Sequence, residues 1–140
     1  MLTEQDAHLS CSENTAKLQL RLRVYQGAEI AFGPGKADLL EQIQKTGSIS
    51  KAAKQLSMSY RRAWLLVDTM NHCFQQPLVT TQTGGNQGGG AQVTTVGLHV
   101  LSLFRTMEQA ALAAIKTQHD QLAALMQHGV NESLKMNVQS

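Results

Sequence analysis

Two short helical patterns separated by a tight turn, within residues 47–70, limit the fold of this chain more than any other feature of its sequence. Ser50 can cap a first short helix, and a second helix is predicted over about 59–74. The pair Ala52-Ala53 provides a small surface across which the second helix can pack closely. The turn has Ser57 where many such motifs carry glycine. The pattern predicts a helix-turn-helix.

The residues before this motif predict a β-hairpin and one further helix. Apolar and polar residues alternate strictly from Lys17 to Tyr25, which is typical of a half-buried strand. Alternation resumes at Ile30 and Phe32 after a short break, so the two segments can pair as a hairpin. A helix is then predicted over about 36–46, and Gly47 stands where its C-terminus would be.

The residues after the motif predict a second hairpin and a long helix. Leu78 to Thr83 and Val93 to Thr95 have strand composition, and the glycine tract from Gly84 to Gly90 can join them. From about Val96 apolar residues recur at steps of three and four, which predicts a long helix that ends near Gly129. We expect a mainly α fold with a small β content (α+β): a helix-turn-helix with an N-terminal β-hairpin, a second hairpin and a long C-terminal helix.

The chain has 140 residues, of which 42% are hydrophobic, so it can bury one core. We expect a flexible arm over 1–16, a helix-turn-helix domain over 17–95, a long helix over 96–128, and a frayed C-terminus over 129–140. The first residues lack the pattern of a targeting peptide, and no stretch approaches the ~20 apolar residues that span a bilayer. We therefore expect a cytoplasmic protein without membrane contact.

The distribution of charge indicates a nucleic-acid partner, although the net charge is only +2. The segment from Gln42 to Val67 carries five basic residues and no acidic one. Arg61 and Arg62 lie in the first turn of the predicted second helix, from where a recognition helix reaches base edges. Lys51 and Lys54 on the first helix can reach flanking phosphates. The alternative for such a segment is an ordinary solvated basic face.

Several short motifs in the same region are those of a known family. They are Gly47-Ser48-Ile49-Ser50, Ala53-Lys54, Ser59-Tyr60-Arg61-Arg62-Ala63-Trp64, Met70-Asn71 and the tract from Thr83 to Gly90. On these residues, the stretch from about Leu18 to Leu112 resembles the N-terminal winged-helix domain of the ModE-type molybdate-responsive regulators, which are related to LysR-type DNA-binding heads. The resemblance implies that residues 17–95 form a winged helix-turn-helix DNA-binding domain and that the helix over 96–128 is a linker and dimerisation helix. It implies a homodimeric, sequence-specific transcription regulator that binds double-stranded DNA. The helix from about Ser59 would enter the major groove, and the hairpin from Gly84 to Gly90 would be the wing.

Two sets of candidate residues follow from the charges and the resemblance together. The expected DNA contacts are Ser48, Lys51, Lys54, Ser59, Tyr60, Arg61, Arg62, Thr83, Asn86 and Gln87. The expected dimer contacts on the long helix are Leu101, Phe104, Ala111, Ile115, Leu122 and Leu125. The apolar face of that helix supports a dimer independently, because a single helix of this length cannot bury two apolar sides against a small body.

Other classes of function fit the sequence less well. The glycine tract has no lysine for a phosphate-binding loop, and the neighbours His72 and Cys73 point about 100° apart on a helix, which is unsuitable for a nucleophile and its base. The five histidines and two cysteines lack metal-ligand spacing. We expect no enzyme activity, no cofactor and no metal. The remaining alternative is an interaction module that pairs with another regulator or with a separate sensor protein.

The family's regulators continue into C-terminal domains that bind oxyanions and sense molybdate. The present sequence ends at Ser140, and the residues from about 129 to 140 are too few to form an oxyanion pocket. We therefore expect no tight binding of molybdate.

Overall fold

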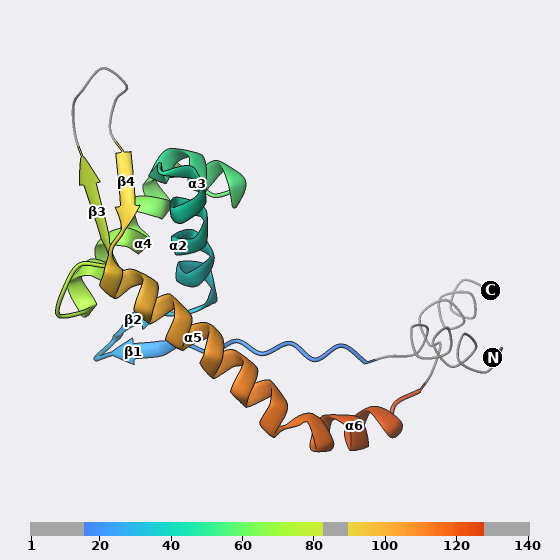
Figure 1. Ribbon diagram of the computed structural model, residues 1–140. Coiled ribbons are helices and arrows are strands. Elements are labelled where there is room, and N and C mark those ends of the chain that lie inside the picture. The colour runs from blue at the N-terminus through green and yellow to red at the C-terminus, as the bar shows by residue number, and fades with distance from the viewer. Residues whose placement is uncertain (1–15, 83–89, 128–140) are drawn as a thin grey trace, which may run out of the picture. The chain divides into compact units, whose positions relative to one another are not determined.

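The structure is a computed structural model that describes residues 16–82 and 90–127 (Figure 1). The elements follow one another as β1 (Val24–Gln26), β2 (Glu29–Phe32), α2 (Pro34–Thr46), α3 (Ile49–Gln55), α4 (Tyr60–Cys73), β3 (Val79–Gln82), β4 (Gly90–Val93), α5 (Thr95–Ala114) and α6 (Lys116–Ala124). They belong to two compact units: the larger is Arg21–Ala110, and the smaller includes the described residues 16–20 and 111–127. The first part of α5 therefore belongs to the larger unit. The expected arm over 1–16, apart from Ala16, and the expected frayed C-terminus over 129–140 lie outside the described residues.

Helices α3 and α4 form the predicted helix-turn-helix. Ser48, and not Ser50 as expected, caps α3, because its Oγ accepts a hydrogen bond of 3.1 Å from the backbone N–H of Lys51. In the turn, Ser57 has a φ of +56°, which is the left-handed conformation that explains why glycine is common at this place. Met58 then donates its backbone N–H to the carbonyl of Ala53 at 3.0 Å. The turn is therefore held by backbone hydrogen bonds.

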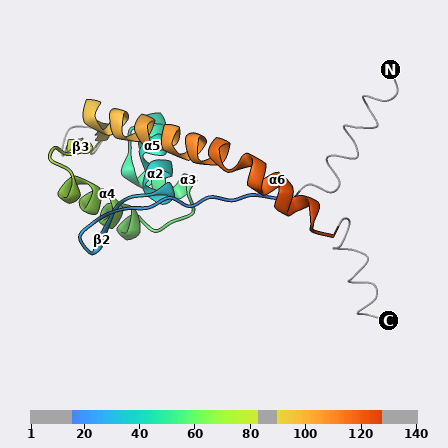
Figure 2. The same ribbon diagram turned by 90° about the horizontal axis from the view of Figure 1, so that it is seen from below.

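The core of the larger unit lies among the three helices and the first part of α5. Phe32 at the end of β2 is its centre, and its ring meets Phe104 of α5 and Phe74 edge to face with centroids 5.1 and 6.3 Å away. The small residues Ala52 and Ala63 are completely buried where α3 and α4 cross, as the sequence predicted. Figure 2 shows β2 beside α4, with which it is in contact.

Polar side chains fix the second hairpin to the helices. The Asn71 amide of α4 donates to the carbonyl of Val79 at 2.9 Å, and its oxygen accepts the backbone N–H groups of Leu78 and Val79. Thr94 accepts from the backbone N–H of Gly97 at 3.0 Å and donates to the carbonyl of Pro77 at 2.8 Å. The base of the β3–β4 hairpin is therefore tied to α4 on one side and to the start of α5 on the other.

The predicted N-terminal strand is much shorter than expected. Its alternation begins at Lys17, but β1 covers only Val24–Gln26, and residues 16–23 have no regular structure. Its one partner, β2, has four residues, and the pairing is irregular between Val24 and Tyr25. Leu18 and Val24 remain 38% and 41% exposed. The alternating pattern therefore predicted a longer and more buried strand than the structure has. A strand forms only where another strand can pair with it.

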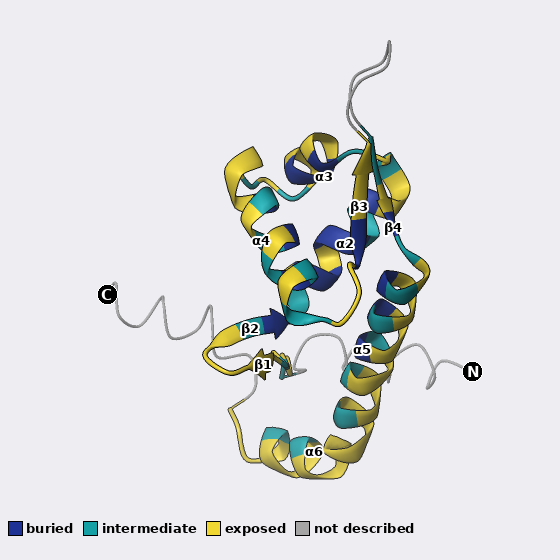
Figure 3. Ribbon diagram, turned by 90° about the vertical axis from the view of Figure 1, so that its left-hand side faces the viewer, coloured by how far each residue is buried: buried dark blue, intermediate teal, exposed yellow. Residues whose placement is uncertain are grey.

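The predicted long helix consists of two helices that meet at Ile115. Two of its expected dimer residues, Leu101 and Phe104, are only 8% and 2% exposed, because they pack into the core of their own chain. The structure therefore corrects the expectation that these two side chains face a second copy. Figure 3 shows the buried side of α5 and the largely exposed α6.

None of the helices described between residues 16 and 82 or between 90 and 127 has both the length and the apolar character needed to cross a bilayer. The three-helix core with a β-hairpin on each side is an α+β winged-helix fold.

Candidate nucleic-acid interface

The two cap residues of the motif place hydroxyl groups at the starts of α3 and α4. Ser48 Oγ accepts the N–H of Lys51, and Ser59 Oγ accepts the N–H of Arg62 at 3.0 Å. A hydroxyl that accepts in this way keeps its own hydrogen available as a donor. Both predicted DNA-contact serines thus have a structural role. Ser59 can still donate to an external acceptor such as a phosphate, whereas the Ser48 hydroxyl also lies 3.5 Å from that of Ser50, and either of these two can be the donor.

The cations predicted to contact DNA are accessible. Lys51 and Lys54 on α3 and Arg61 and Arg62 on α4 are all exposed, as is Lys45 on α2. Among the residues that the structure describes, none of these five takes part in an ion pair. Their charges are therefore not neutralised within the described part of the chain, as an anionic partner requires.

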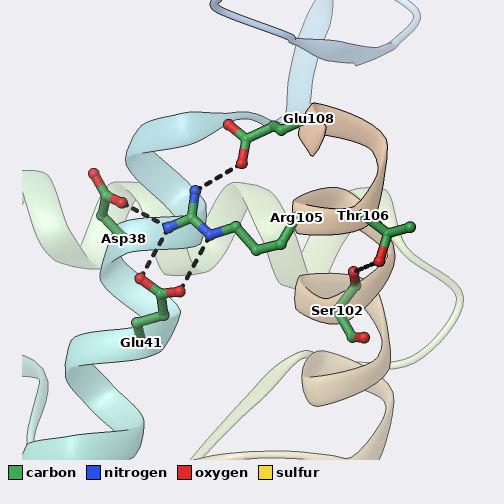
Figure 4. A network of polar contacts seen from close by, with 6 residues as sticks. All are labelled: Asp38, Glu41, Ser102, Arg105, Thr106 and Glu108. Atoms are coloured by element: carbon green, nitrogen blue, oxygen red, sulfur yellow. Dashed lines mark hydrogen bonds and ion pairs between the residues drawn. The ribbon is translucent and has the colours of Figure 1, made fainter. Parts of the chain in front are cut away.

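Three acidic residues of the larger unit surround a different cation. Figure 4 shows Arg105 of α5 held by Asp38 and Glu41 of α2 and by Glu108 of its own helix. The Nη2 atom lies 2.8 Å from Asp38 and 2.9 Å from Glu41. The Glu41 hydrogen bonds are the main reason that the pKa of Arg105 is raised above its ordinary value. Negative charge is thus concentrated on the α2–α5 contact and is absent from Gln42 to Val67, whereas Asp68 lies farther along α4.

Arg62 differs from Arg61 in its electrostatic surroundings. Burial lowers the pKa of the Lys36 amine, and the positive charge of Arg62 lowers it further, whereas Cys73 and Glu29 act in the opposite direction. Arg62 is therefore close enough to the start of α2 to act on Lys36. Consecutive residues on a helix diverge by about 100°, so Arg61 projects in another direction. Of the two, Arg61 is the better candidate for contact with base edges.

An open groove of about 290 Å³ lies between the start of α4 and the end of the β3–β4 strands formed by Gln82 and Gly90. The Tyr60 and Trp64 rings, which meet edge to face with centroids 6.1 Å apart, form part of its lining. Thr81 and Gln82 of β3 line it too, and neither was predicted as a site residue. Thr81 could have been found from the strand pattern, because it lies on the same face of β3 as the buried Val79.

The structure brings together seven of the ten expected DNA-contact residues on adjoining elements, α3 and α4 with their caps. The other three, Thr83, Asn86 and Gln87, lie outside the described residues.

The structure gives no support to a metal centre or a nucleophile in the described segments. Within residues 16–82 and 90–127, no group of three or more His, Cys, Asp or Glu residues could hold a metal ion. His72 is exposed and lies 3.9 Å from Glu29, while Cys73 is half-buried.

Comparison with known proteins identifies relatives of one kind, although no family model matches the chain. The molybdenum transport protein ModE of Azotobacter vinelandii is 42% identical over 78 residues, which are 56% of this chain and 29% of the relative. The transcriptional regulator ModE of Yersinia pestis is 36% identical over 114 residues, 79% of this chain and 43% of the relative. The DNA-binding transcriptional dual regulator ModE of Escherichia coli is 33% identical over 105 residues, 75% and 39% of the two chains.

Two solved structures are similar to the chain at low sequence identity. ArgP from Mycobacterium tuberculosis has a TM-score of 0.43 and 22% identity, over 59% of this chain and 30% of its own. A variant of ZitR from Lactococcus lactis has a TM-score of 0.47 and 15% identity, over 86% and 84%. The chain spans less than half the length of the curated relatives described above. On the evidence of its sequence, the chain is a homologue of the N-terminal part of the ModE molybdate-responsive transcriptional regulators.

Proposed function

We propose that the chain is a sequence-specific, DNA-binding transcription regulator that acts as a homodimer and has no catalytic step. The observation that carries this proposal is the set of exposed cations on α3 and α4, which have no acidic partner in the described part of the chain. Such a surface suits a polyanion, and a helix-turn-helix supplies the shape that enters a major groove. The names of the relatives from Yersinia pestis and Escherichia coli agree with it.

In this proposal α4 lies in the major groove and the β3–β4 hairpin is the wing beside it. Arg61, in the first turn of α4, reads a base edge, for which guanine offers two acceptors to one guanidinium. Lys51 and Lys54 bind the phosphates on one side, and Ser48 and Ser59 donate hydroxyl hydrogens to phosphate oxygens. Phosphate contacts set the position of the protein, and the few base contacts provide the sequence preference.

The homodimer is proposed to form through an exposed apolar stripe of α5 that lies next to its buried side. Leu103, Met107 and Ala110 recur at steps of four and three residues, the spacing of a seam between two helices. Leu103 is 53% exposed and Met107 is 47% exposed. Of the originally expected residues, Ile115, Leu122 and Leu125 are exposed in the smaller unit and remain candidates for the same contact.

The proposal is tested by selecting binding sites from a library of random-sequence duplexes with the purified chain. We expect an inverted repeat with half-sites about one helical turn apart, because a two-fold dimer reads two equivalent sites.

Replacement of Arg61 and Arg62 by alanine together should abolish specific binding while the fold and the dimer remain. The matched control replaces Arg21 and Arg23, which are also exposed but lie outside the motif. Absence of any retained sequence at physiological salt would instead favour an interaction module that pairs with another regulator.

A further inference from the structure

The groove between α4 and the β3–β4 hairpin is lined by uncharged groups. Among the described residues, none of those that line it carries a charge. Its lining includes three hydroxyl side chains, one amide and two aromatic rings, namely those of Ser48, Ser50, Thr81, Gln82, Tyr60 and Trp64. Hydroxyl and amide groups can donate to acceptor oxygens, and aromatic rings offer a flat apolar surface. A ligand suited to this lining combines an apolar ring with acceptor oxygens.

The walls of the groove are fixed by hydrogen bonds. The backbone N–H of Ala91 in β4 donates to the carbonyl of Gly47 at 2.9 Å, which fastens β4 to the turn before α3. Gln82 pairs with Gly90 across the hairpin, and Ser48 is held by its cap hydrogen bond to Lys51. The groove therefore exists before any ligand binds, so a ligand is not required to order it.

Two of the lining residues have cations next to them in the chain. Lys51 follows Ser50 and Arg61 follows Tyr60, and both cations are exposed. An anionic polymer attracted by these cations would have its backbone directed along the groove between them and the wing. The repeating unit of DNA that combines an apolar ring with acceptor oxygens is the deoxyribose with its phosphate.

We propose that this groove holds one deoxyribose-phosphate unit of one DNA strand at the point where that strand passes between α4 and the wing. The sugar lies against the rings of Tyr60 and Trp64, and phosphate oxygens accept hydrogen bonds from the hydroxyls of Thr81 and Ser50. The inference rests on the proposed function and adds to it a contact that needs no cation. Because counterion release depends on neutralised phosphates, this contact strengthens binding without a change in its salt dependence.

The test measures affinity and its salt dependence for a duplex selected from the random-sequence library. Thr81→Val removes one hydroxyl, and Tyr60→Ala removes one ring that is 55% exposed. Each should weaken binding about tenfold, the usual effect of losing one good contact to a charged oxygen or its sugar, with the slope of log K against log salt unchanged. Thr80→Val on the other face of the strand and Tyr25→Ala, at 57% exposed, are matched controls that should bind as the wild type.

A second measurement uses Trp64, which is the only tryptophan of the chain. Quenching of its fluorescence by acrylamide should decrease when the duplex saturates the protein, because the sugar covers the ring. This readout does not depend on any substitution, and it would not respond to DNA bound at another face.

The outcomes separate the groove from the proposed function. If the wild type binds the duplex and the pair of variants Arg61→Ala and Arg62→Ala abolishes binding, but Thr81→Val, Tyr60→Ala and the Trp64 quenching all match their controls, the groove proposal is wrong and the function stands. A reduced salt slope in Thr81→Val would overturn the claim that the contact is uncharged. Failure of the wild type to bind any duplex would overturn both.

Discussion

Gly97 is the residue where the chain has least freedom to change. It lies at the start of α5, where the helix crosses the backbone of Leu78, and a Cβ added there would be 2.8 Å from Val93 Cγ1 and closer still to the carbonyl oxygen of Leu78. We expect Gly97→Ala to destabilise the fold by about 2 kcal/mol or more, because rigid backbone must move to make room. The measurement is the urea midpoint of the full chain.

The control for this substitution is Gly35→Ala in the first turn of α2, where no atom lies within 4 Å of an added Cβ. Alanine there should raise stability by about 0.5 kcal/mol, because it reduces the entropy of the unfolded chain without a clash. Equal effects of the two substitutions would show that Gly97 is not in close contact with Leu78 and Val93.

Lys36 is the one charged residue that is buried among those that the structure describes. It is only 7% exposed, and burial lowers its pKa below the ordinary value of 10.5. In the pH range between the lowered pKa and 10.5 the unfolded chain binds more protons, so stability rises with pH there. Lys36→Met should therefore stabilise the protein at pH 7 by up to about 1 kcal/mol, and the gain should shrink as the pH approaches 10.5. Lys45→Met at an exposed position should show no such pH dependence.

At the scale of elements, Arg105 joins α5 to α2 more strongly than a typical surface pair. Its side chain is 31% exposed and bonds to two carboxylates across the contact and to one on its own helix. Arg105→Met would remove these bonds and leave three carboxylates near one another, and we expect a loss of about 1–2 kcal/mol after allowance for screening by solvent. Arg105→Lys should restore only part of it, because an ammonium cannot bond to both oxygens of Glu41 in the same planar geometry.

The control for the Arg105 substitutions is the ion pair between Lys116 and Asp120 on α6. Its side chains are 73% and 58% exposed, and the hydrogen bond from Lys116 lowers the pKa of the Asp120 carboxyl. Lys116→Met should change the urea midpoint much less than Arg105→Met, because exposed pairs on one helix contribute little. A similar loss in both variants would contradict the proposed importance of the α2–α5 contact.

Local signals predicted some elements accurately and failed for others. For α4, the inward-facing residues Ala63, Val67 and Met70 recur at helical spacing within the segment itself, so the predicted range 59–74 and the observed helix nearly agree. The cap of α3 was assigned to the wrong serine because Ser48 and Ser50 both carry a hydroxyl that can cap a helix, and the sequence alone does not distinguish them. The length of the N-terminal strand was predicted wrongly. Alternation shows which face a strand could bury, but it does not show whether another element covers that face.

The candidate site could be predicted where it depends on charge and not where it depends on packing between distant elements. The absence of acidic residues from Gln42 to Val67 is a property of the sequence, and it identified the cations directly. The role of Thr81 depends on the pairing of Ala91 with Gly47, which no local pattern reveals. For the same reason, Leu101 and Phe104 could not be distinguished in advance from the neighbouring stripe of α5 that remains exposed.

At the scale of the whole molecule, the proposed dimer links the exposed stripe of α5 to the salt dependence of DNA binding. Leu103→Glu together with Met107→Glu should give a monomer in sedimentation experiments, because two carboxylates on each helix would repel across the seam. The control, Ser102→Glu with Gln109→Glu, adds the same charge to the polar side of α5 and should leave the dimer intact.

The same variants should change the salt dependence of binding in a defined way. If a dimer neutralises roughly eight phosphates, the slope of log K against log salt is about −7, and a monomer bound to one half-site should have about half that slope. The slope measured between low and physiological salt therefore indicates whether one or two chains contact the DNA. A slope near −2 for the wild type would contradict the proposal that the α3 and α4 cations bind phosphates. An unchanged slope in a variant shown to be monomeric would instead mean that only one chain of the dimer touches the duplex.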